Sequence, residues 1–333
     1  MKKIKKTMLV TGGAGFIGSH LCEDLLFRGF SVIAIDNLST SSRQNISHLL
    51  KNPDFKFYKG SILDAALMAR LIKKSTVIYH MAAAVGVKYI LDHPLGSIIT
   101  NLKGTETVLD LAYKLRKKIV IASTSEVYGK HVCEPFKEDD DRTLGPTSIS
   151  RWGYAEAKAI DEFLALAYSK EHKLKVVIVR LFNVVGPRQV ARYGMVLPRF
   201  VQQALNHDPL TVYGDGLQLR TFMYVKDATA AIIDLSLEKK AEKGIFNIGT
   251  DQTVSVNELA LKVKEITHSN SEIKFIPYDQ AYGDKAAEFQ DMLCRIPDIS
   301  KIKKLINYQP KYSLDAIIEN TIKYFSEKQR IKK

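Results

Sequence analysis

A glycine-rich turn near the N-terminus constrains this chain most, because it requires a particular order of strand, turn and helix. The turn, GAGFIG at residues 13–18, follows the apolar segment Met8–Thr11 and opens the helical pattern Phe16–Arg28. Glycines at these spacings permit a tight turn and a close approach of the backbone to a pyrophosphate, which the helix N-terminus attracts. In this context the sequence predicts a dinucleotide site that includes Gly12, Gly15, Phe16, Ile17 and Gly18.

A carboxylate stands where the second strand of such a unit ends. Asp36 follows the segment Ser31–Ile35, and a carboxylate at that place binds the adenine ribose hydroxyls. It would repel a phosphate on that ribose, so the sequence favours NAD over NADP. Asp64 is a further candidate, although it can equally cap the predicted helix Ala65–Ile72. Further candidates for cofactor contact follow the strands in the same way: Asn37, Ile62, Ala82 and Ala83. Tyr154 and Lys158, on a later predicted helix, complete the set, and Lys158 can hold the nicotinamide ribose.

Short β-branched segments alternate with helical patterns through the first half of the chain. This alternation predicts an α/β protein with a Rossmann-type, doubly wound parallel sheet. After Gly186-Pro187 the segments become short and irregular, which is typical of a smaller C-terminal α/β subdomain that binds substrate. We therefore expect residues 1–183 to be mainly the NAD-binding domain and 184–333 mainly the substrate-binding subdomain, with some exchange of strands and helices between them. The predicted strands are Met8–Thr11, Ser31–Ile35, Phe55–Lys59, Thr76–His80, Ile119–Ser123 and Lys175–Arg180.

A tyrosine and a lysine lie one helical turn apart in the second half of that domain. Tyr154 and Lys158 are spaced i,i+4, so both project from one helix face. A free tyrosine has a pKa near 10, which is too high for a base at neutral pH. A nearby ammonium together with a cationic nicotinamide would favour the phenolate and lower that pKa. Thr124, Ser125 and Glu126 follow the fifth predicted strand and bring hydroxyls and a carboxylate to the same rim. These five side chains predict proton transfer to or from an alcohol.

Composition excludes several classes of protein. The net charge of +13 comes from lysines at both chain ends and in scattered runs, without an aromatic-interleaved basic stretch, so we expect no nucleic-acid partner. No apolar run reaches the roughly 20 residues that span a bilayer, so we expect no membrane partner. Three widely spaced cysteines suit a reducing cytoplasm, and the eight histidines form no ligand pattern, so we expect no metal.

Taken together, the ordered motifs resemble the extended short-chain dehydrogenase/reductase family, in its nucleotide-sugar epimerase, decarboxylase and dehydratase branch. The resemblance covers nearly the whole chain. It rests on TGGAGFIGSHL at 11–21, DNL at 36–38, HMAA at 80–83, STSEVYG at 123–129, Tyr154 with Lys158, RLFN at 180–183, GPR at 186–188, VYGDG at 212–216 and RIPD at 295–298. It implies a tightly held NAD and a nucleoside-diphosphate sugar, most simply a UDP-sugar. Tyr154 would take the O4 proton while the C4 hydride passes to the cofactor, and the hydride returns later.

The resemblance also implies which residues bind the substrate. Asn183, Arg220 and Arg295 would hold the diphosphate, a task that suits planar cationic side chains. Tyr213 would lie near the nucleobase. Arg188 and Lys88 belong to the same set of substrate-binding candidates.

The residues after the fifth strand bear on the reaction that follows oxidation. The 4,6-dehydratases of the family carry Thr-Asp-Glu, whose Asp is the acid for the departing C6 hydroxyl, whereas this chain has Thr124-Ser125-Glu126. Without that acid, dehydration is disfavoured. Thr-Ser-Glu resembles UDP-glucuronate decarboxylases, in which a 4-ketone lets the C5 carboxylate leave as carbon dioxide. There Glu126 would lie near the carboxylate and Arg295 close by, giving UDP-xylose or a UDP-4-keto-pentose.

The sequence also allows other functions. The segment AVGVKY at 84–89 resembles 4-epimerases, which interconvert UDP-glucose with UDP-galactose or the corresponding uronates. A non-catalytic NAD-binding regulator would be expected to lose Tyr154 or Lys158, and both are present. The sequence thus leaves decarboxylase and epimerase open, and Glu126 favours the decarboxylase.

Two long predicted helices, 93–115 and 154–171, resemble the pair that forms the dimer interface in this family. We therefore expect a homodimer, although these apolar faces can also be wholly internal.

Overall fold

A seven-stranded parallel sheet forms the centre of the protein. The structure, a computed structural model, describes residues 5–332 apart from 85, 87–89, 91, 131–133, 191–194, 284–285 and 287–289. The strand order is β3-β2-β1-β4-β5-β6-β11, and every neighbouring pair is parallel. This order reverses direction at β1 and confirms the predicted doubly wound, Rossmann-type α/β fold. The strands are β1 (Thr7–Thr11), β2 (Ser31–Asp36), β3 (Phe55–Lys59), β4 (Val77–His80), β5 (Lys118–Thr124), β6 (Val176–Leu181) and β11 (Gly244–Ile248).

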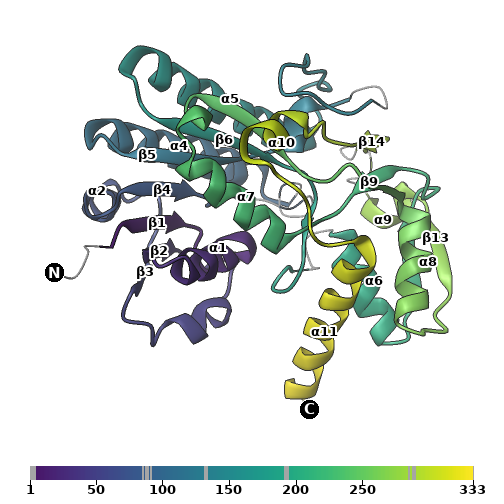
Figure 1. The fold of residues 1–333 in the computed structure, drawn as a ribbon. Coiled ribbons are helices and arrows are strands. Elements are labelled where there is room, and N and C mark those ends of the chain that lie inside the picture. Colours follow the sequence, from purple (N-terminus) through teal and green to yellow (C-terminus); the bar gives the residue numbers. More distant parts are fainter. Residues whose placement is uncertain are drawn as a thin grey trace.

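Helices cover both faces of the sheet, as Figure 1 shows. One face carries α2 (Ala65–Lys74), α4 (Pro94–Lys114) and α5 (Ser150–His172), and the other carries α1 (Phe16–Phe27) and α7 (Val225–Leu237). Successive strand residues alternate between these two layers, so Leu9 enters one core while Met8 and Val10 enter the other. Both faces are therefore apolar, which explains why the strands read as continuous hydrophobic segments.

The C-terminal half contributes to both parts of the molecule. Its strand β11 and helix α7 join the central sheet, whereas its other elements form small sheets and helices beside the carboxyl ends of the strands (Figure 1). Strand β11 and helix α7 thus lie beyond residue 183 in the sequence but pack with the strands that precede it. These further elements are β7 (Val184–Val185), α6 (Val196–Leu205), β8 (Leu210–Tyr213), β9 (Leu219–Thr221), β10 (Met223–Tyr224), β12 (Thr253–Ser255), α8 (Val256–Ile266), β13 (Ile273–Ile276), α9 (Tyr278–Tyr282), β14 (Cys294–Arg295), α10 (Ser300–Ile306) and α11 (Leu314–Lys332). Single-turn and 3-10 segments lie at Arg43–Leu49, Ser125–Tyr128 and Lys239–Ala241.

A buried ion pair fastens the end of β6 to α5. Arg180 donates to both carboxylate oxygens of Glu162, at 3.0 and 2.7 Å, and both side chains are almost fully buried. Ser123, near the end of β5, donates to the same carboxylate. This pair therefore fixes the position of β6 relative to β5 and α5, and the predicted catalytic residues lie on or directly after β5 and on α5.

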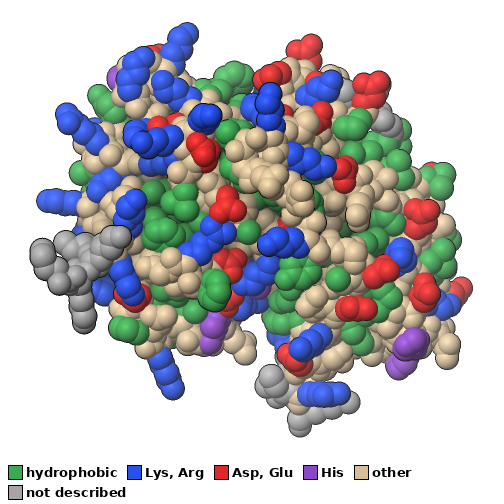
Figure 2. Space-filling view, in the orientation of Figure 1, with side chains coloured by type: hydrophobic (Ala, Val, Ile, Leu, Met, Phe, Trp, Pro, Cys, Tyr) green, Lys and Arg blue, Asp and Glu red, His purple; other side chains and the backbone are tan. Residues whose placement is uncertain are grey.

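The molecular surface is mixed in charge. On the face in Figure 2, lysine and arginine side chains lie scattered, with acidic side chains between them. Among the described residues, every helix is too short or too polar to pass through a bilayer.

The Arg180–Glu162 pair yields a prediction about stability. Glu162→Gln keeps the shape but leaves the buried Arg180 without a counter-charge, so we expect the free energy of unfolding to fall by about 3–5 kcal/mol. The control is Asp251→Asn, which removes a carboxylate that pairs with Lys303 at the surface and should cost no more than about 1 kcal/mol. Urea unfolding measures both. Equal losses in the two variants would contradict this account of the pair.

Candidate active site

A cavity of about 320 Å³ opens at the carboxyl ends of β1, β2 and β4, and we call it the dinucleotide cavity. In a parallel sheet this edge is where loops gather around a ligand. The cavity brings together most of the residues predicted to bind the cofactor: Gly12, Gly15, Phe16, Ile17, Gly18, Asp36, Asn37, Ile62, Ala82 and Ala83.

The glycine-rich turn is packed so closely that side chains would not fit. Gly12 has a φ of 68°, and a Cβ on it would lie 2.9 Å from the backbone nitrogen of Ala82. A Cβ on Gly18 would lie 2.0 Å from the carbonyl oxygen of Gly12. The turn therefore brings bare backbone and the N-terminus of α1 to the cavity wall, an arrangement that fits a pyrophosphate.

Asp36 is held at the end of β2 by three donors. Its carboxylate accepts from the Ala14 amide at 3.0 Å, the Leu38 amide at 2.8 Å and the Ser41 hydroxyl at 2.7 Å. A carboxylate has about four lone-pair sites, so it retains the capacity to accept from a ribose hydroxyl. This donor set fits the adenine ribose of a dinucleotide.

Three predicted binding residues are not found, within the described part of the chain, in the cavity where the sequence predicted them. Asp64 accepts from the Leu67 amide at 2.9 Å and caps α2, and it is absent from the cavity lining, so its carboxylate serves the helix. Arg188 binds Glu23 and donates to the Ser19 hydroxyl at 3.2 Å, which places it at the dinucleotide cavity instead of with the substrate candidates. Lys88 lies outside the described residues.

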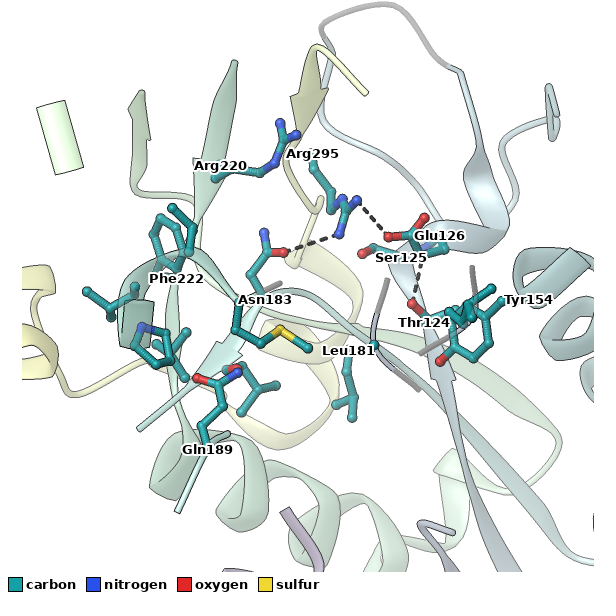
Figure 3. A pocket seen from close by; sticks show the side chains of 18 of the residues that line it. Thr124, Ser125, Glu126, Tyr154, Leu181, Asn183, Gln189, Arg220, Phe222 and Arg295 are labelled. Carbon is teal, nitrogen blue, oxygen red and sulfur yellow. Dashed lines mark hydrogen bonds and ion pairs between the residues drawn. The ribbon is translucent and has the colours of Figure 1, made fainter. Parts of the chain in front are cut away.

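A second cavity, of about 370 Å³, adjoins the first and shares Phe16, Ile17 and Met81 with it. We call it the arginine cavity because Arg151, Arg199, Arg220 and Arg295 line it. Figure 3 shows its predicted catalytic residues on one side and its predicted substrate-binding residues on the other. The predicted residues that line it are Thr124, Ser125, Glu126, Tyr154, Asn183, Tyr213, Arg220 and Arg295.

Glu126 lies between two arginines on the wall of this cavity. Arg295 Nη2 is 2.7 Å from Glu126 Oε1 (Figure 3). Arg151 Nη2 is 3.2 and 3.3 Å from the two carboxylate oxygens of Glu126. Burial by itself would raise the pKa of Glu126, but the two guanidinium groups outweigh it and hold that pKa at about 2. Glu126 is therefore an ionised carboxylate at neutral pH.

The arginine cavity carries positive charge in excess. Arg220 pairs with Asp291 at 2.8 Å, and burial together with the charges of Arg295 and Arg151 lowers the pKa of Arg220 to about 10. Among the described residues, Arg151, Arg220 and Arg295 form ion pairs with two carboxylates, those of Glu126 and Asp291. An anion in the cavity would relieve the repulsion between the arginines, so the site is built for an anionic ligand.

Asn183 presents an amide donor to the same space. Its φ of 39° is uncommon for a residue other than glycine, and its side chain lines the cavity beside Arg295 (Figure 3). Its Oδ1 accepts from Arg295 Nη1 at 3.3 Å, whereas its buried Nδ2 makes no hydrogen bond with any described residue. A strained residue with an unused buried donor fits a ligand that accepts there.

Tyr154 and Lys158 are arranged differently from what the sequence predicted. Burial, and next the charge of Glu126, raise the pKa of the Tyr154 phenol, while a hydrogen bond with Thr124 lowers it only in part. The expected lowering by Lys158 is not seen, because the Lys158 ammonium lies 2.7 Å from the Asp161 carboxylate behind the cavity wall. Lys158 lines neither cavity.

Sequence reasoning missed several residues of the arginine cavity. Arg199 lies with its guanidinium carbon 3.9 Å from the centre of the Tyr213 ring, and Tyr282 packs edge-on against that ring. Arg199 lies on α6, Tyr278 and Tyr282 lie on the short helix α9, and Asp291 lies between named elements, so no shared motif or spacing connects these four residues in the sequence. Arg151 was the one that could have been found, since it stands one helical turn before Tyr154.

Comparison with known proteins agrees with this geometry. Residues 9–321 match the family model described as GDP-mannose 4,6 dehydratase. A UDP-N-acetyl-alpha-D-glucosaminuronate decarboxylase of Bacillus cytotoxicus is 41% identical over 97% of this chain and 99% of its own length. UDP-glucuronic acid decarboxylase 1 of Arabidopsis thaliana is 36% identical over 92% of this chain and 67% of its own.

The fold also matches that of a solved nucleotide-sugar enzyme. The UDP-glucuronic acid 4-epimerase of Bacillus cereus, in complex with UDP-glucuronic acid and NAD, superposes with a TM-score of 0.85 and 30% identity, covering 96% of this chain and 99% of that one. The predicted family and an NAD-dependent enzyme of the decarboxylase or epimerase type are thereby confirmed. The chain belongs to the GDP-mannose 4,6-dehydratase family of nucleotide-sugar enzymes, within the extended short-chain dehydrogenases/reductases.

Proposed function

We propose that this protein decarboxylates a UDP-hexuronate through a transient 4-keto sugar, with UDP-glucuronate as the leading substrate. The observation that carries the proposal is the position of Glu126, ionised between Arg151 and Arg295 and beside Tyr154. The names of the relatives in the two decarboxylase comparisons support it.

In this proposal the dinucleotide cavity holds NAD, which accepts the C4 hydride and later returns it. The turn at Gly12, Gly15 and Gly18 would contact the pyrophosphate, and Asp36 would accept from the adenine ribose. Since that carboxylate would repel a 2′-phosphate, the site favours NAD over NADP.

Tyr154 would remove the O4 proton of the sugar. Its phenol shares a hydrogen bond with Thr124, and both side chains line the arginine cavity, so a sugar hydroxyl there can bond to both. The surroundings of Tyr154 hold its pKa high, and the positive nicotinamide supplies the charge that lowers it. Proton removal is therefore tied to the presence of the oxidised cofactor.

Arg151 and Arg295 would bind the C5 carboxylate, and Glu126 would oppose its charge. Once the 4-ketone exists, the C5–carboxyl bond can break, because its electrons pass into the enolate at O4. Tyr154 and Thr124 can donate hydrogen bonds to that enolate oxygen. The departure of carbon dioxide removes the charge that Glu126 disfavours, and a proton from solvent then adds to C5 of the enolate to give the 4-keto pentose.

The charge state of Glu126 also bears on dehydration. In a 4,6-dehydratase the corresponding glutamate removes a proton at C5, whereas Glu126 has a pKa of about 2 and accepts protons weakly. Ser125 occupies the position of the required acid. Decarboxylation needs neither function, which favours it over dehydration.

The diphosphate and base would occupy the rest of the arginine cavity. Arg220 and the unused amide of Asn183 are the proposed diphosphate ligands, with Arg295 lying between them and the sugar. Tyr213 would lie against the uracil ring. The Arg199 guanidinium, which stacks on Tyr213, would hold the tyrosine ring in place.

Two alternatives have their own support. The relative that is 41% identical is named for a 2-acetamido substrate, UDP-N-acetylglucosaminuronate, so that uronate is the second candidate for decarboxylation. The solved neighbour is named as a 4-epimerase of UDP-glucuronic acid, which supports C4 inversion without loss of carbon. The segment at 84–89, which resembles epimerases, lies mostly outside the described residues.

Direct assays of product separate these candidates. Purified protein is incubated in turn with UDP-glucuronate, UDP-N-acetylglucosaminuronate and UDP-glucose, and products are resolved by chromatography and mass spectrometry. We expect UDP-glucuronate to lose the mass of carbon dioxide, and Glu126→Gln to lower that rate by roughly 10²-fold. The control Asp251→Asn, at the surface, should retain the rate. An isobaric product with inverted C4 would contradict the decarboxylase proposal.

We also propose a homodimer that forms through α4 and α5. These neighbouring helices leave apolar side chains exposed to solvent: Leu95, Ile99, Tyr113, Ile160 and Phe163. An apolar surface of this kind on paired helices suits a second copy of the same surface. Location in the cytoplasm stays a prediction from the cysteine content.

The dimer surface can be tested with a matched pair of substitutions. Phe163, on α5, is 64% exposed and Phe27, on α1 across the sheet, is 93% exposed. We expect Phe163→Asp to convert the dimer to a monomer, because it places a charge in the interface, and Phe27→Asp to leave the dimer unchanged. Size-exclusion chromatography with light scattering measures both. A monomeric wild-type protein, or an unaffected Phe163→Asp dimer, would contradict the proposed interface.

A further inference from the structure

A buried ion pair lies behind the wall that carries Tyr154. Lys158 Nζ is 2.7 Å from Asp161 Oδ2, and the two side chains, one helical turn apart on α5, are 2% and 0% exposed. Neither residue lines a cavity. Taking two charges out of water is costly, so this pair needs further support from its surroundings.

That support comes from polar side chains on three other elements. Thr105, on α4, lowers the pKa of Asp161 by a hydrogen bond, and its hydroxyl lies 3.2 Å from His80 Nε2 at the end of β4. His80 Nδ1 in turn lies 2.9 Å from the hydroxyl of Thr11 at the end of β1. A chain of polar groups thus leads from Lys158 to the start of the glycine-rich turn.

The donors and acceptors of this chain fit only one order. The Thr11 hydroxyl accepts from the Ala82 amide at 3.1 Å, so its own proton is available to His80 Nδ1. The Asp161 carboxylate only accepts, so Thr105 donates to it and takes its own hydrogen bond from a protonated His80 Nε2, which leaves Nδ1 to accept from Thr11. This order requires a neutral imidazole, and burial together with the charge of Lys158 lowers the pKa of His80 to about 3.

The Thr105–Asp161 contact is the weakest step of the chain. Thr105 acts on the Asp161 carboxylate, yet Oδ1 of Asp161 makes no hydrogen bond of ordinary geometry with any described residue. The ion pair with Lys158 is therefore the interaction that fixes the carboxylate, and Thr105 adds to it.

We propose that Asp161 is a positioning residue, which holds Lys158 charged and in place for the nicotinamide ribose. Thr105, His80 and Thr11 connect this ion pair to Ala82 in the wall of the dinucleotide cavity. The inference rests on the proposed function, in which NAD is the cofactor, and it adds that Lys158 binds the nicotinamide ribose. It assigns a role to a carboxylate that touches neither cofactor nor substrate.

Of the charged groups around the pair, Asp161 is the one that supplies the counter-charge to the Lys158 ammonium. Glu162, the next residue on α5, raises the pKa of Asp161, but Arg180 neutralises Glu162. His80, on β4, is neutral. Tyr154, on α5, has its pKa raised in part by Asp161. Without Asp161, the buried ammonium of Lys158 would lose its counter-charge, and burial without a counter-charge favours the neutral amine.

Asp161→Asn tests the inference through cofactor binding. NAD+ is titrated by calorimetry into the full chain freed of nucleotide, at about pH 7 and about pH 9. The wild type should bind equally at both. Asp161→Asn should bind about tenfold more weakly at the lower pH, the effect of one lost charge-assisted hydrogen bond, and still more weakly at the higher pH. Binding by Asp161→Asn that matches the wild type at both pH values would overturn the proposal.

Asp315→Asn is the matched control, because Asp315 Oδ1 lies 2.7 Å from Lys262 Nζ in an exposed pair. It should bind NAD+ as the wild type does. Failure of the wild type to bind NAD+ would overturn both the inference and the proposed function. Inactivity toward every UDP-sugar, with NAD+ binding intact, would count against the proposed function alone.

Thr105→Val keeps the inference testable if Asp161→Asn does not fold. The substitution removes only the hydroxyl, so the pKa of Asp161 should rise further above its usual value. As the pH falls, the carboxylate of the variant would be protonated earlier, and Lys158 would lose its anchor at a higher pH than in the wild type. NAD+ affinity measured on acidification should show that shift, and superimposable wild-type and variant curves would overturn the proposal.

Discussion

The ion pairs that join Glu126 to Arg151 and Arg295 are the interactions on which the site depends. Glu126 follows β5, Arg151 begins α5, and Arg295 ends β14, a strand from the C-terminal part of the chain. Burying one carboxylate between two guanidinium groups is costly unless each keeps its partner. The cluster therefore joins the parallel sheet to the smaller C-terminal elements at the place where the sugar must lie.

The chemistry that we propose follows from the charge of this cluster. An ionised Glu126 is a poor base and a poor acid, but it opposes a second carboxylate held by the same arginines. The arrangement therefore suits a reaction that removes a carboxylate from the substrate. Among the described residues, the Lys158 ammonium is engaged by Asp161, and the pKa of the Tyr154 phenol is raised, so in this account the phenol depends on the oxidised cofactor for its activation. In this account the reaction needs both cavities, because Tyr154 in the arginine cavity is activated by the cofactor in the dinucleotide cavity.

Local sequence patterns predicted the parts of the structure that are themselves local. The glycine-rich turn and Asp36 lie within one strand–helix–strand unit, and the structure brings them to one cavity as expected. Contacts between segments that are distant in the sequence were not predicted. Arg151 meets Glu126, and Asp291 meets Arg220, across segments far apart in sequence, and no periodicity signals such pairs. Strand β11 likewise joins the central sheet from beyond the predicted domain boundary.

The Asp64 and Lys158 predictions show why residue type alone is insufficient. Asp64 stands after a strand, where ligand-binding carboxylates occur, and its carboxylate accepts from the Leu67 amide and caps α2, one of the two roles that the sequence allowed. Lys158 has the spacing from Tyr154 that predicts an ammonium beside the phenol, but Asp161, three residues further on, competes for it. In both cases a nearby partner of opposite polarity determined where the side chain points.

The most direct test of the central claim is to follow the reaction of UDP-glucuronate in deuterium oxide by NMR. Decarboxylation through an enolate predicts a pentose product with one deuterium at C5, because solvent supplies the hydrogen that replaces the carboxylate. A hexuronate product with inverted C4 and no deuterium at C5 would contradict the account. It would show that the pairing of Glu126 with Arg295 serves a 4-epimerase instead.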